Sequence, residues 1–593
     1  MPAMDAAEAH IDLARDGRLF VRPGPGSSLR KVERALRLGG IDGDVDAAAG
    51  GVRVAVAEFD AVRAALAGVT VKAAAAATAA GAHVADRAQW HSAALAACRR
   101  YVAAPSEAAA ALAGYDRVGD LDPHQVTAVA VASHPDVRGL CIFDEQGLGK
   151  TVEALFAFDR LREQELVTRA LVFAPKNMLL EWVHDLGRFF GEKYSAAVAV
   201  GPEVEKRAVI GSGADLLVTN FETAAQLEVR LRHFLEAERG RALLIVDESF
   251  FVKNAQAVRA QALRSLRRCA GRCLVLCGTP APNSAIDLVE QFNIADDGAA
   301  FQGVTIPNDP DEARTLIREV VEERGVYLRR IKQAVLPDLP ERSFNQVRVP
   351  LAPRQRSLYE AARQGLIDDL RTVDDDVFRR QRASFMARRA ALLQICSNPG
   401  AVDPCYDELP AKLAAIDELL EDLIDRRGEK VLLWSFFTRS IEGIMERYGR
   451  YQPVRIDGSV TNVADRREAV RRFQEDADTM LFVANPAAAG AGLTLHRARF
   501  AVYESMSNQA AHYLQSLDRI HRRGQKRPVD YIVLLCDETI EVPEYERLLE
   551  KERAAQDLLG DEVVAPATRS TLLAELLQHQ GPARSGEEGA ALR

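Results

Sequence analysis

The sequence predicts an α/β protein with two similar parallel-sheet halves, helical insertions between them and a small α+β module at the N-terminus. Three observations predict this class. From about residue 115 onward, short apolar segments alternate with helical stretches, as in a mostly parallel sheet covered by helices. The alternation occurs in two separate series. Ahead of both, a shorter pattern of strand, helix, strand and helix lies in an alanine-rich region.

Length and composition are those of a folded protein with several domains. The chain has 593 residues, enough to bury more than one core, and its 48% apolar and 27% charged fractions are ordinary for a globular protein. The net charge of -9 argues against a uniformly basic nucleic-acid coat. Any contact with phosphate would therefore have to come from local basic runs such as 378–389 and 521–527. Taken alone, a run of this kind is more often a solvated helix face than a phosphate-binding site.

Targeting patterns and cysteine spacing bear on the cellular compartment. No run of about 18 apolar residues occurs, and the first residues lack a basic segment followed by an apolar one, so neither a membrane span nor a signal peptide is expected. The eight cysteines have no CxxC spacing, and Cys269, Cys273 and Cys277 have no nearby histidine that would complete a zinc set. We therefore expect reduced thiols in a cytoplasmic protein.

Residues 1–114 are expected to form an accessory module with an alanine-rich joint. Apolar alternation and glycines at a helix end indicate its elements. Proline and glycine predict a turn at 22–28, and low complexity predicts a joint at 72–82. The predicted strands are 18–23 and 51–57, and the predicted helices are 28–40 and 58–68.

The two α/β series predict two lobes, residues 115–283 and 411–563. Residues 284–410 between them are helical in character and rich in Arg, Asp and Glu, and residues 564–593 are expected to form a flexible tail. Strands of the first lobe are expected at 139–143, 170–174, 215–220, 242–247 and 273–278. Strands of the second lobe are expected at 430–435, 451–457, 479–485, 500–505 and 531–535.

A glycine-rich turn follows the first of these strands and opens a helix, in the segment CIFDEQGLGKTVEAL. The backbone N–H groups and the helix dipole of such a turn hold phosphates. Lys150 would reach the β- and γ-phosphates, and the Thr151 hydroxyl would bind Mg²⁺. Asp144 stands where the general pattern asks for glycine. A GxGKT run can be an accident, but the strand, turn and helix around it favour a phosphate loop (Walker A).

Two carboxylates end another apolar strand. The uncharged run LLIV stops at Asp247 and Glu248, as a buried parallel strand does when it delivers side chains to the edge of a sheet. Asp247 would hold Mg²⁺, and Glu248 would position or deprotonate the attacking water. Acidic pairs at strand ends are common on protein surfaces, but the separation of this pair from Lys150 favours a nucleotide site.

Twelve segments in a fixed order extend this pattern over residues 115–560. They are LDPHQVTAVAVA, DEQGLGKT, LVFAPKNMLLEW, VTNFET, DESFFVKN, CGTPAPN, YLRRIKQAVLPDLP, LLQICSNP, VLLWSFFTRS, RIDGSV, NPAAAGAGLTL and QSLDRIHRRGQ. Together they resemble the motifs of the Swi/Snf-type ATPases, the double-stranded DNA translocases of helicase superfamily two. The resemblance implies two RecA-like lobes, ATP and Mg²⁺ as cofactors, and a monomeric motor that acts on double-stranded DNA, forked or branched DNA included.

The resemblance also implies the residues of the ATP site. Gln125 matches a glutamine that reads adenine, and Asp247 and Glu248 match the metal and water carboxylates. Arg519 and Arg522 match two arginines that face the γ-phosphate from the opposite lobe, where a guanidinium suits the charge of the transition state. The implied nucleotide-binding residues are Gln125, Asp144, Gly147, Leu148, Gly149, Lys150, Thr151 and Gln515, with Thr151 and Asp247 at the metal.

The residues implied to serve DNA lie on both lobes. Their amides and hydroxyls would hold one strand of a duplex without reading its bases. Gly278, Thr279 and Pro280 match an element that relays between ATP and DNA. The other positions are Lys176, Thr219, Ser435, Gly490 and Gly492. Four residues are interpreted as structural or solvent residues: Asn177, His184, His496 and His512. Trp182 and Trp434 are interpreted as core residues.

Three positions depart from the family pattern. Phe250 stands where a histidine is usual, Ala489 where a glycine is common, and Thr494 where an asparagine is frequent. A phenylalanine cannot make the hydrogen bond that links the hydrolysis site to the opposite lobe. The coupling of ATP turnover to DNA is therefore in question, whereas ATP hydrolysis itself is not. The form GLTL is more similar to HARP-type annealing proteins and their bacterial and phage relatives than to nucleosome remodellers. The order of elements in the N-terminal module is loosely similar to that of a HARP-like DNA-binding domain.

The predicted function is ATP-dependent translocation on double-stranded DNA, with movement along DNA or remodelling of protein–DNA complexes. One alternative is an ATP-gated DNA clamp with weak translocation, for which Phe250 is the motive. The other keeps the motor but directs it to RNA or to strand separation. The sequence does not identify the biological process, the preferred DNA structure or a protein partner.

Overall fold

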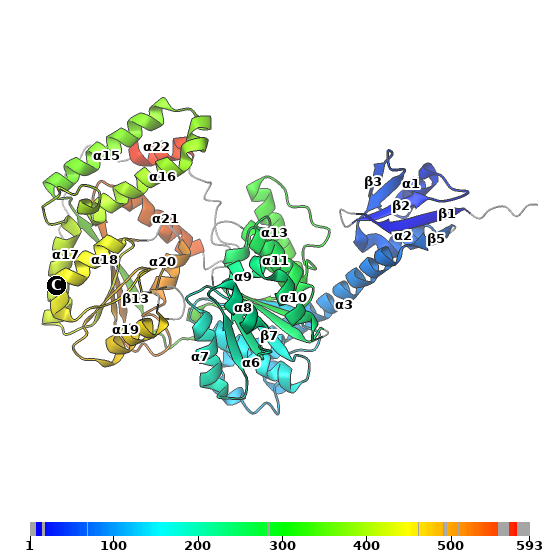
Figure 1. Ribbon diagram of the computed structural model, residues 1–593, viewed down its shortest axis with the longest axis horizontal. Helices are drawn as coiled ribbons and strands as arrows, with labels where there is room; N and C mark the ends of the chain where they lie inside the picture. Colours follow the sequence, from blue (N-terminus) through cyan, green and yellow to red (C-terminus); the bar gives the residue numbers. More distant parts are fainter. Residues whose placement is uncertain are drawn as a thin grey trace, which may run out of the picture.

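The computed structural model describes residues 7–14, 18–67, 69–238, 240–278, 280, 285–460, 462–489, 493, 495–506, 510–554 and 568–577. Three units follow one another along the chain: an N-terminal module and two α/β lobes (Figure 1). The module, in dark blue, stands away from the lobes and is joined to the first lobe by helix α3 (Ala75–Ala103).

The N-terminal module is a mixed five-stranded sheet with two short helices. The helices are α1 (Leu29–Leu38) and α2 (Phe59–Ala65). Fully buried Ile11, Val21 and Val62 contribute to its separate apolar core. The strand order is β3-β4-β2-β1-β5, with β1 (Glu8–Leu13), β2 (Leu19–Pro23), β3 (Gly43–Asp46), β4 (Gly51–Val54) and β5 (Thr70–Ala73).

The sequence indicates β2, β4, α1 and α2 but misses β1 and the two edge strands of the module, β3 and β5. The side chains of β3 and β5 are mostly exposed, so neither strand has the apolar alternation of a half-buried strand. The low-complexity stretch predicted as a joint at 72–82 is mostly helical, because it forms the start of α3, where alanine is the strongest helix former.

Helix α3 is anchored at both ends. Near its start it packs so closely on the module that a Cβ at Gly81 would lie 2.5 Å from the Phe59 ring. Near its end, Ala94 and Tyr101 belong to the core of the first lobe. Between them, an Arg87 guanidinium nitrogen donates to Gln302 Oε1 at 2.7 Å. Helix α3 therefore joins the module to the first lobe and packs against both.

The first lobe is a seven-stranded parallel sheet in the order β12-β6-β11-β10-β7-β9-β8. Its strands are β6 (Gly139–Ile142), β7 (Arg169–Phe173), β8 (Ala196–Ala199), β9 (Leu216–Thr219), β10 (Ala242–Val246), β11 (Arg272–Leu276) and β12 (Tyr327–Leu328). Its helices are α4 (Pro105–Ala111), α5 (Pro123–Ala132), α6 (Lys150–Glu163), α7 (Leu179–Phe190), α8 (Glu203–Ile210), α9 (Phe221–Gln226), α10 (Glu228–Glu236), α11 (Val258–Arg267), α12 (Ile286–Asp296), α13 (Pro310–Arg324) and α14 (Lys332–Val335).

Strand order brings the predicted motifs of this lobe to one place. Strands β6, β11 and β10 are neighbours, and all run in the same direction. Their carboxyl ends lead into the glycine-rich turn, Gly278 and the Asp247–Glu248 pair, respectively. In an open α/β sheet, ligands bind outside the carboxyl ends of the strands.

The second lobe is a six-stranded parallel sheet in the order β13-β18-β17-β14-β16-β15. Its strands are β13 (Arg342–Val349), β14 (Val431–Trp434), β15 (Val454–Ile456), β16 (Leu481–Ala484), β17 (Phe500–Tyr503) and β18 (Val529–Cys536). Its helices are α15 (Pro353–Thr372), α16 (Asp375–Ser397), α17 (Ala411–Leu420), α18 (Thr438–Arg447), α19 (Val463–Glu475), α20 (Ala510–Leu517), α21 (Glu541–Ala554) and α22 (Arg569–Leu577).

The region 284–410 is not only helical. It supplies β12 to the first sheet and β13 to the second, where β13 pairs with β18 over its whole length. Both strands lie at sheet edges, and most side chains of β13 are not buried, which hides the strand from an apolar pattern. The helical character is real in α15 and α16, which form a long hairpin above the second lobe and pack against α22 (Figure 1).

None of the helices in the described ranges is both long and apolar enough to cross a membrane. All eight cysteines have free thiols, and six of them are buried.

Candidate active site between the lobes

The glycine-rich turn is shaped as a cradle at the start of α6. Gly147 and Gly149 have φ values of 84° and 91°, in the left-handed region that favours glycine. A Cβ at Gly149 would also lie 2.4 Å from Gln125 Nε2. Lys150 Nζ donates to the Asp144 carbonyl oxygen at 2.8 Å, which holds the ammonium over the turn. The backbone N–H groups at the start of α6 thus face the same space as a cation.

Two predicted nucleotide residues brace this turn from behind. Gln125 lies in the first turn of α5, where its Oε1 accepts from the Asp122 backbone N–H at 3.0 Å. Its Nε2 donates to the Leu148 carbonyl at 3.2 Å. The Asp144 carboxylate is fully buried in an ion pair with Arg330, so it holds the loop rather than facing the space above it. Adenine recognition by Gln125 stays a prediction.

The carboxylate pair follows β10 as the sequence predicts. Asp247 Oδ2 accepts from Trp182 Nε1 at 3.0 Å, and Asp247 Oδ1 accepts from the Glu248 backbone N–H at 2.9 Å. Glu248 has a φ of 48°, an unusual left-handed conformation for a non-glycine residue. Gln146 Nε2 donates to Glu248 Oε1 at 3.1 Å. Each carboxylate is thus held by a donor from a different element.

Burial sets the electrostatics of the pair. Desolvation, followed by the charge of Glu248, raises the pKa of Asp247 to about 7. Desolvation also raises the pKa of Glu248, against the opposing charges of Lys150 and Arg519. A site of this kind favours any further cation, and carboxylate and hydroxyl oxygens are ligands that Mg²⁺ prefers. The Thr151 hydroxyl and Asp247 line one cavity and fit that role.

The arginines of the second lobe reach the same cavity. Arg519 and Arg522 lie in the turn after α20 and donate to the Leu493 carbonyl at 3.2 and 3.1 Å. Arg519 Nε also donates to the Gln515 carbonyl at 2.7 Å, so Gln515 acts on the arginine through its backbone. Desolvation and the charge of Arg522 lower the pKa of Arg519 to about 10. Buried guanidinium groups that form no ion pair with a carboxylate of the described residues favour an anion between the lobes.

The cavity between the lobes has a volume of about 300 Å³. Both lobes line it, so its shape depends on how the two lobes are placed. Helix α7 supplies residues that the sequence did not single out or, like His184, assigned to structure or solvent. The lining residues are Gln146, Gly147, Gly149, Lys150, Thr151, Val152, Met178, Glu181, His184, Asp185, Arg188, Phe189, Asp247, Glu248, Asp518, Arg519 and Arg522.

A second cavity of about 730 Å³ also lies between the lobes. Lys176 after β7 faces it from the first lobe, and Arg466, Arg467 and Arg471 on α19 face it from the second. Asn177, interpreted above as structural or solvent, lines it too. Basic groups from the two lobes thus face one opening, which Glu181, Asp457 and Glu475 also line.

Several residues predicted to contact DNA do not present their side chains. The Thr219 hydroxyl donates to the Ala199 carbonyl at 2.7 Å and is fully buried. The Ser435 side chain is fully buried as well. Gly278 lies against the Gln146 side chain, which a Cβ would approach to 2.5 Å, and the Pro280 carbonyl accepts from Gln291. Predicted positions that fall outside the described residues are Thr279, Gly490, Gly492 and Thr494.

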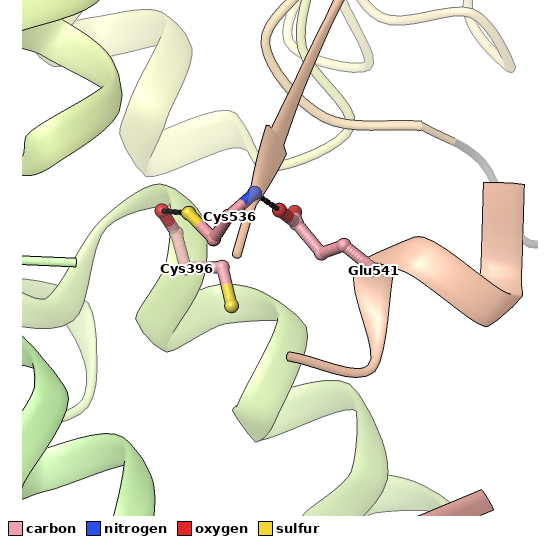
Figure 2. Close-up of side chains that lie close together, drawn as sticks. All are labelled: Cys396, Cys536 and Glu541. Carbon is pink, nitrogen blue, oxygen red and sulfur yellow. Dashed lines mark hydrogen bonds between the residues drawn. The ribbon is translucent and has the colours of Figure 1, made fainter. Parts of the chain in front are cut away.

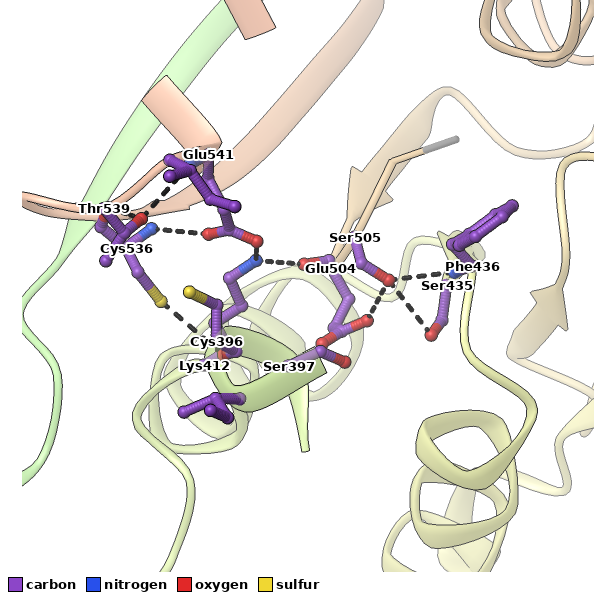
Figure 3. A network of polar contacts seen from close by, with 12 residues as sticks. Cys396, Ser397, Lys412, Ser435, Phe436, Glu504, Ser505, Cys536, Thr539 and Glu541 are labelled. Carbon is purple, nitrogen blue, oxygen red and sulfur yellow. Dashed lines mark hydrogen bonds and ion pairs between the residues drawn. The ribbon is translucent and has the colours of Figure 1, made fainter. Parts of the chain in front are cut away.

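A buried polar network supports the loop after β14 (Figure 3). Lys412 Nζ donates to the Glu504 carbonyl at 2.5 Å and pairs with Glu541 Oε1 at 2.6 Å. Ser505 Oγ accepts from the Phe436 backbone N–H at 2.8 Å. The network therefore fixes the ends of β17 and β14 relative to each other, beside the loop predicted to contact DNA.

The same network contains two thiols beside a carboxylate (Figure 2). The ligand atoms of Cys396, Cys536 and Glu541 lie within 4.8 Å of one another. Both oxygens of Glu541 are engaged, by Lys412 and by the Cys536 backbone N–H at 2.8 Å. A hydrogen bond to Cys396 and burial raise the pKa of the Cys536 thiol well above its ordinary value, and a thiol binds metal as the thiolate. The cluster is therefore an ion-paired support of the fold.

Phe250 lies in an aromatic stack beside the carboxylates. Its ring stacks on Phe251 with centroids 4.5 Å apart, and Phe251 stacks on Phe221 at 5.6 Å. Phe221 in turn stacks on Phe173, at the end of β7. Where the family has a polar residue, this chain thus extends the apolar core of the first lobe.

Two family models match the chain in succession. A SNF2-related domain matches residues 122–401, and a helicase conserved C-terminal domain matches residues 411–524. The chain is of the Swi/Snf type within helicase superfamily two. The matches cover most of both lobes and of the region between them.

Named relatives of this Swi/Snf-type chain include much longer proteins. The ISWI chromatin-remodeling complex ATPase ISW1 of Saccharomyces cerevisiae is 27% identical over 488 residues, which are 77% of this chain and 41% of the relative. A SWI/SNF-related matrix-associated actin-dependent regulator of chromatin subfamily A-like protein 1 of Xenopus laevis is 25% identical over 447 residues, 71% of this chain and 42% of the relative. The chain thus spans about two fifths of the length of these relatives.

Solved structures are also similar to this Swi/Snf-type chain. One is the Sulfolobus solfataricus SWI2/SNF2 ATPase core in complex with dsDNA, at 20% identity and a TM-score of 0.34. That match covers 77% of this chain and 97% of the solved one.

Trp182 gives a first test of the site. Replacing Trp182 by Phe keeps a buried ring but removes the N–H that Asp247 accepts. Because groups that orient a metal ligand typically change metal affinity or activity by about 10- to 100-fold, we expect the Mg²⁺ concentration for half-maximal ATPase to rise by about tenfold. Trp434→Phe is the matched control, since Trp434 is fully buried and its Nε1 has no hydrogen-bond partner in the described part of the chain. An equal shift in both variants would contradict the assignment.

Phe250 gives a second test. We expect Phe250→His to keep ATP hydrolysis but to change its dependence on DNA, because imidazole restores a hydrogen-bonding group beside the carboxylates. Phe250→Leu is the control, since it removes the ring without adding a polar atom. The measurement is the ATPase rate over a titration of duplex DNA. Identical titration curves for Phe250→His and the unaltered protein would show that position 250 does not couple the two ligands.

Proposed function

We propose that this protein hydrolyses ATP with Mg²⁺ and uses the energy to move along double-stranded DNA. The observation that carries the proposal is a single cavity lined by Lys150, Asp247 and Glu248 of one lobe and by Arg519 and Arg522 of the other. A site divided in this way responds to nucleotide by closing and to hydrolysis by reopening, so it converts chemistry into relative movement of the lobes.

Each member of the ATP site has a distinct part in the proposed reaction. The turn before α6 and Lys150 bind the β- and γ-phosphates. Thr151 and Asp247 would hold Mg²⁺, which neutralises charge on the phosphates. Glu248 orients the attacking water and accepts its proton, and Gln146 keeps that carboxylate in place. Arg519 and Arg522 stabilise the charge that spreads over the γ-phosphoryl oxygens.

DNA lies, in this proposal, along the second cavity. Lys176 on one lobe and Arg466, Arg467 and Arg471 on the other offer cations to a phosphate backbone. Contacts of this kind position a duplex without reading its sequence. Because the contacts are divided between the lobes, closing and reopening of the ATP site would change the grip on DNA. Action on forked or branched DNA and as a monomer remain predictions.

The N-terminal module suits an accessory DNA-binding role. On α1, the exposed side chains of Arg30, Lys31 and Arg34 form no ion pair with a carboxylate among the described residues. The rod-like α3 holds this basic face away from the ATP site (Figure 1). The motor would then have a second contact with DNA outside its two lobes.

An ATP-gated clamp is the second candidate. Phe250 favours it, because its ring extends an apolar stack where coupling asks for a hydrogen-bonding group. A clamp would bind and release DNA as nucleotide turns over, with little net movement.

Displacement of a third strand from a DNA triplex separates these functions. We expect ATP-dependent displacement by the unaltered protein, whereas hydrolysis stimulated by DNA without displacement would indicate the clamp. If RNA or single strands stimulate ATP hydrolysis and duplex DNA does not, the result would indicate that the motor acts on another substrate.

Lys150→Ala and Glu248→Gln test the ATP site itself. We expect both variants to lose about 100-fold or more of the DNA-stimulated ATPase, because each removes a group that acts on the reacting phosphate or water. Both should still bind duplex DNA, measured by fluorescence anisotropy, since neither residue lines the second cavity. Full ATPase activity in either variant would refute the proposed chemistry.

A further inference from the structure

One segment remains without a role in the proposed reaction. Residues 327–332, with the sequence YLRRIK, come at the end of the first lobe and lead into the connection to the second. Strand β12 opens the segment and pairs in parallel with β6, the strand before the phosphate-binding turn. The pairing continues past the strand, because the Phe143 N–H donates to Leu328 O at 2.8 Å and the Glu145 N–H donates to Arg330 O at 2.9 Å. The segment therefore runs beside the turn itself.

Two arginines of the segment form hydrogen bonds and ion pairs with the first lobe. An Arg329 guanidinium nitrogen donates to the Phe143 carbonyl and, at 3.1 Å, to the Gly278 carbonyl. Arg330 pairs with the buried Asp144 and, at 3.0 Å, with Glu153 on α6. The ends of β6 and β11 and the first turns of α6 are thus tied to one another from the segment.

The third cation, Lys332, reaches across to the second lobe. It is only 4% exposed, and its Nζ forms an ion pair with Asp518 and donates to the His521 carbonyl at 3.2 Å. Its backbone N–H donates to Glu145 Oε2 at 2.6 Å. A Cβ at Gly147 would lie 3.2 Å from Lys332 Cε, so the stem of the lysine packs directly on the phosphate-binding turn.

The partner of Lys332 lies next to the arginines that face the nucleotide. Asp518 precedes Arg519 in the chain and lines the same cavity as Arg519 and Arg522. A carboxylate in that position can attract either guanidinium, because opposite charges interact strongly where water is excluded. With Lys332 holding Asp518, the guanidinium groups stay available for phosphate.

We propose that Lys332 is a positioning residue, which engages Asp518 so that Arg519 and Arg522 stay directed at the nucleotide, and which ties them to the phosphate-binding turn. The inference rests on the proposed ATPase function. It gives this chain a polar link between the hydrolysis site and the opposite lobe, although Phe250 supplies none. The link lies in the connection between the lobes and therefore moves with them.

Lys332→Met, Asp518→Asn and the double variant test the proposal. Lys332→Met leaves Asp518 without its ammonium partner, so we expect kcat for DNA-stimulated ATP hydrolysis to fall by about 30-fold. The Kd of a fluorescent ATP analogue should change by less than about threefold, because Lys150 and the turn still bind phosphate. Adding Asp518→Asn removes the competing carboxylate, so we expect the double variant to recover about tenfold in kcat over Lys332→Met.

A transition-state analogue distinguishes positioning from support of the fold. ADP with aluminium fluoride needs correctly placed arginines, whereas ADP alone does not, so the ratio of their affinities should fall in Lys332→Met and recover in the double variant. An unchanged ratio would overturn the proposal. Lys332→Arg, which keeps the charge, should retain more activity than Lys332→Met and provides the comparison should Lys332→Met fail to fold. Equal loss of kcat in folded Lys332→Arg and Lys332→Met would also overturn it.

Arg523→Met is the matched control for breaking an ion pair between the lobes. Arg523 pairs with Asp122 of the first lobe at 2.7 Å, but its side chain is 70% exposed. Because exposed pairs contribute little, we expect less than about a twofold change in kcat. If the unaltered protein hydrolyses no ATP, the proposed function fails. If it is active and Lys332→Met is equally active, only the role of Lys332 fails.

Discussion

Two carboxylates buried side by side at the end of β10 are the constraint around which both lobes are organised. Moving one charged group out of water costs several kcal/mol, and Asp247 and Glu248 also repel each other. The first lobe compensates in part, with the indole N–H of Trp182, the amide of Gln146 and the charge of Lys150. Arg519 of the second lobe adds a further opposing charge at Glu248.

The second lobe has the complementary problem. Arg519 and Arg522 are buried next to each other, and burial lowers the pKa of both. Carbonyl groups satisfy some of their N–H groups, but apart from Asp518 the carboxylates near them belong to the first lobe. Each lobe therefore presents unfavourable charge that the other lobe and a magnesium nucleotide would neutralise. In the proposed mechanism, this mutual need is the physical basis for lobe closure on ATP.

Much of this arrangement could be predicted from local sequence. The turn at Lys150 and the end of β10 each have a pattern that depends on neighbouring residues only, and both lie where predicted. Arg519 and Arg522 could be placed only through the order of family motifs, since nothing local ties them to Lys150. The sequence did not reveal β12, which has only two residues, or β13, whose side chains are mostly not buried and form no continuous apolar run.

Side-chain direction accounts for the other gaps. Trp182 was correctly placed in the core, but the hydrogen bond from its N–H to Asp247 depends on how α7 packs against the sheet. Thr219 and Ser435 were predicted to face DNA, yet their side chains are fully buried in this structure. The sequence did not reveal the role of residues 327–332, because the partners of their side chains are distant in the chain. Arg330 pairs with Asp144 and Lys332 pairs with Asp518, each over a separation of 186 positions.

The most direct test of a site shared by two lobes is single-turnover hydrolysis by Arg522→Ala with saturating duplex DNA. Arg522 contributes no atom to the phosphate-binding turn, so the Kd for a fluorescent ATP analogue should stay within about threefold of the unaltered protein. The account predicts that the hydrolysis rate falls by about 1000-fold, the lower range for loss of an arginine that acts on the γ-phosphate. A rate within about tenfold of the unaltered protein would mean that Arg522 does not act on the γ-phosphate from the second lobe, which would contradict the account.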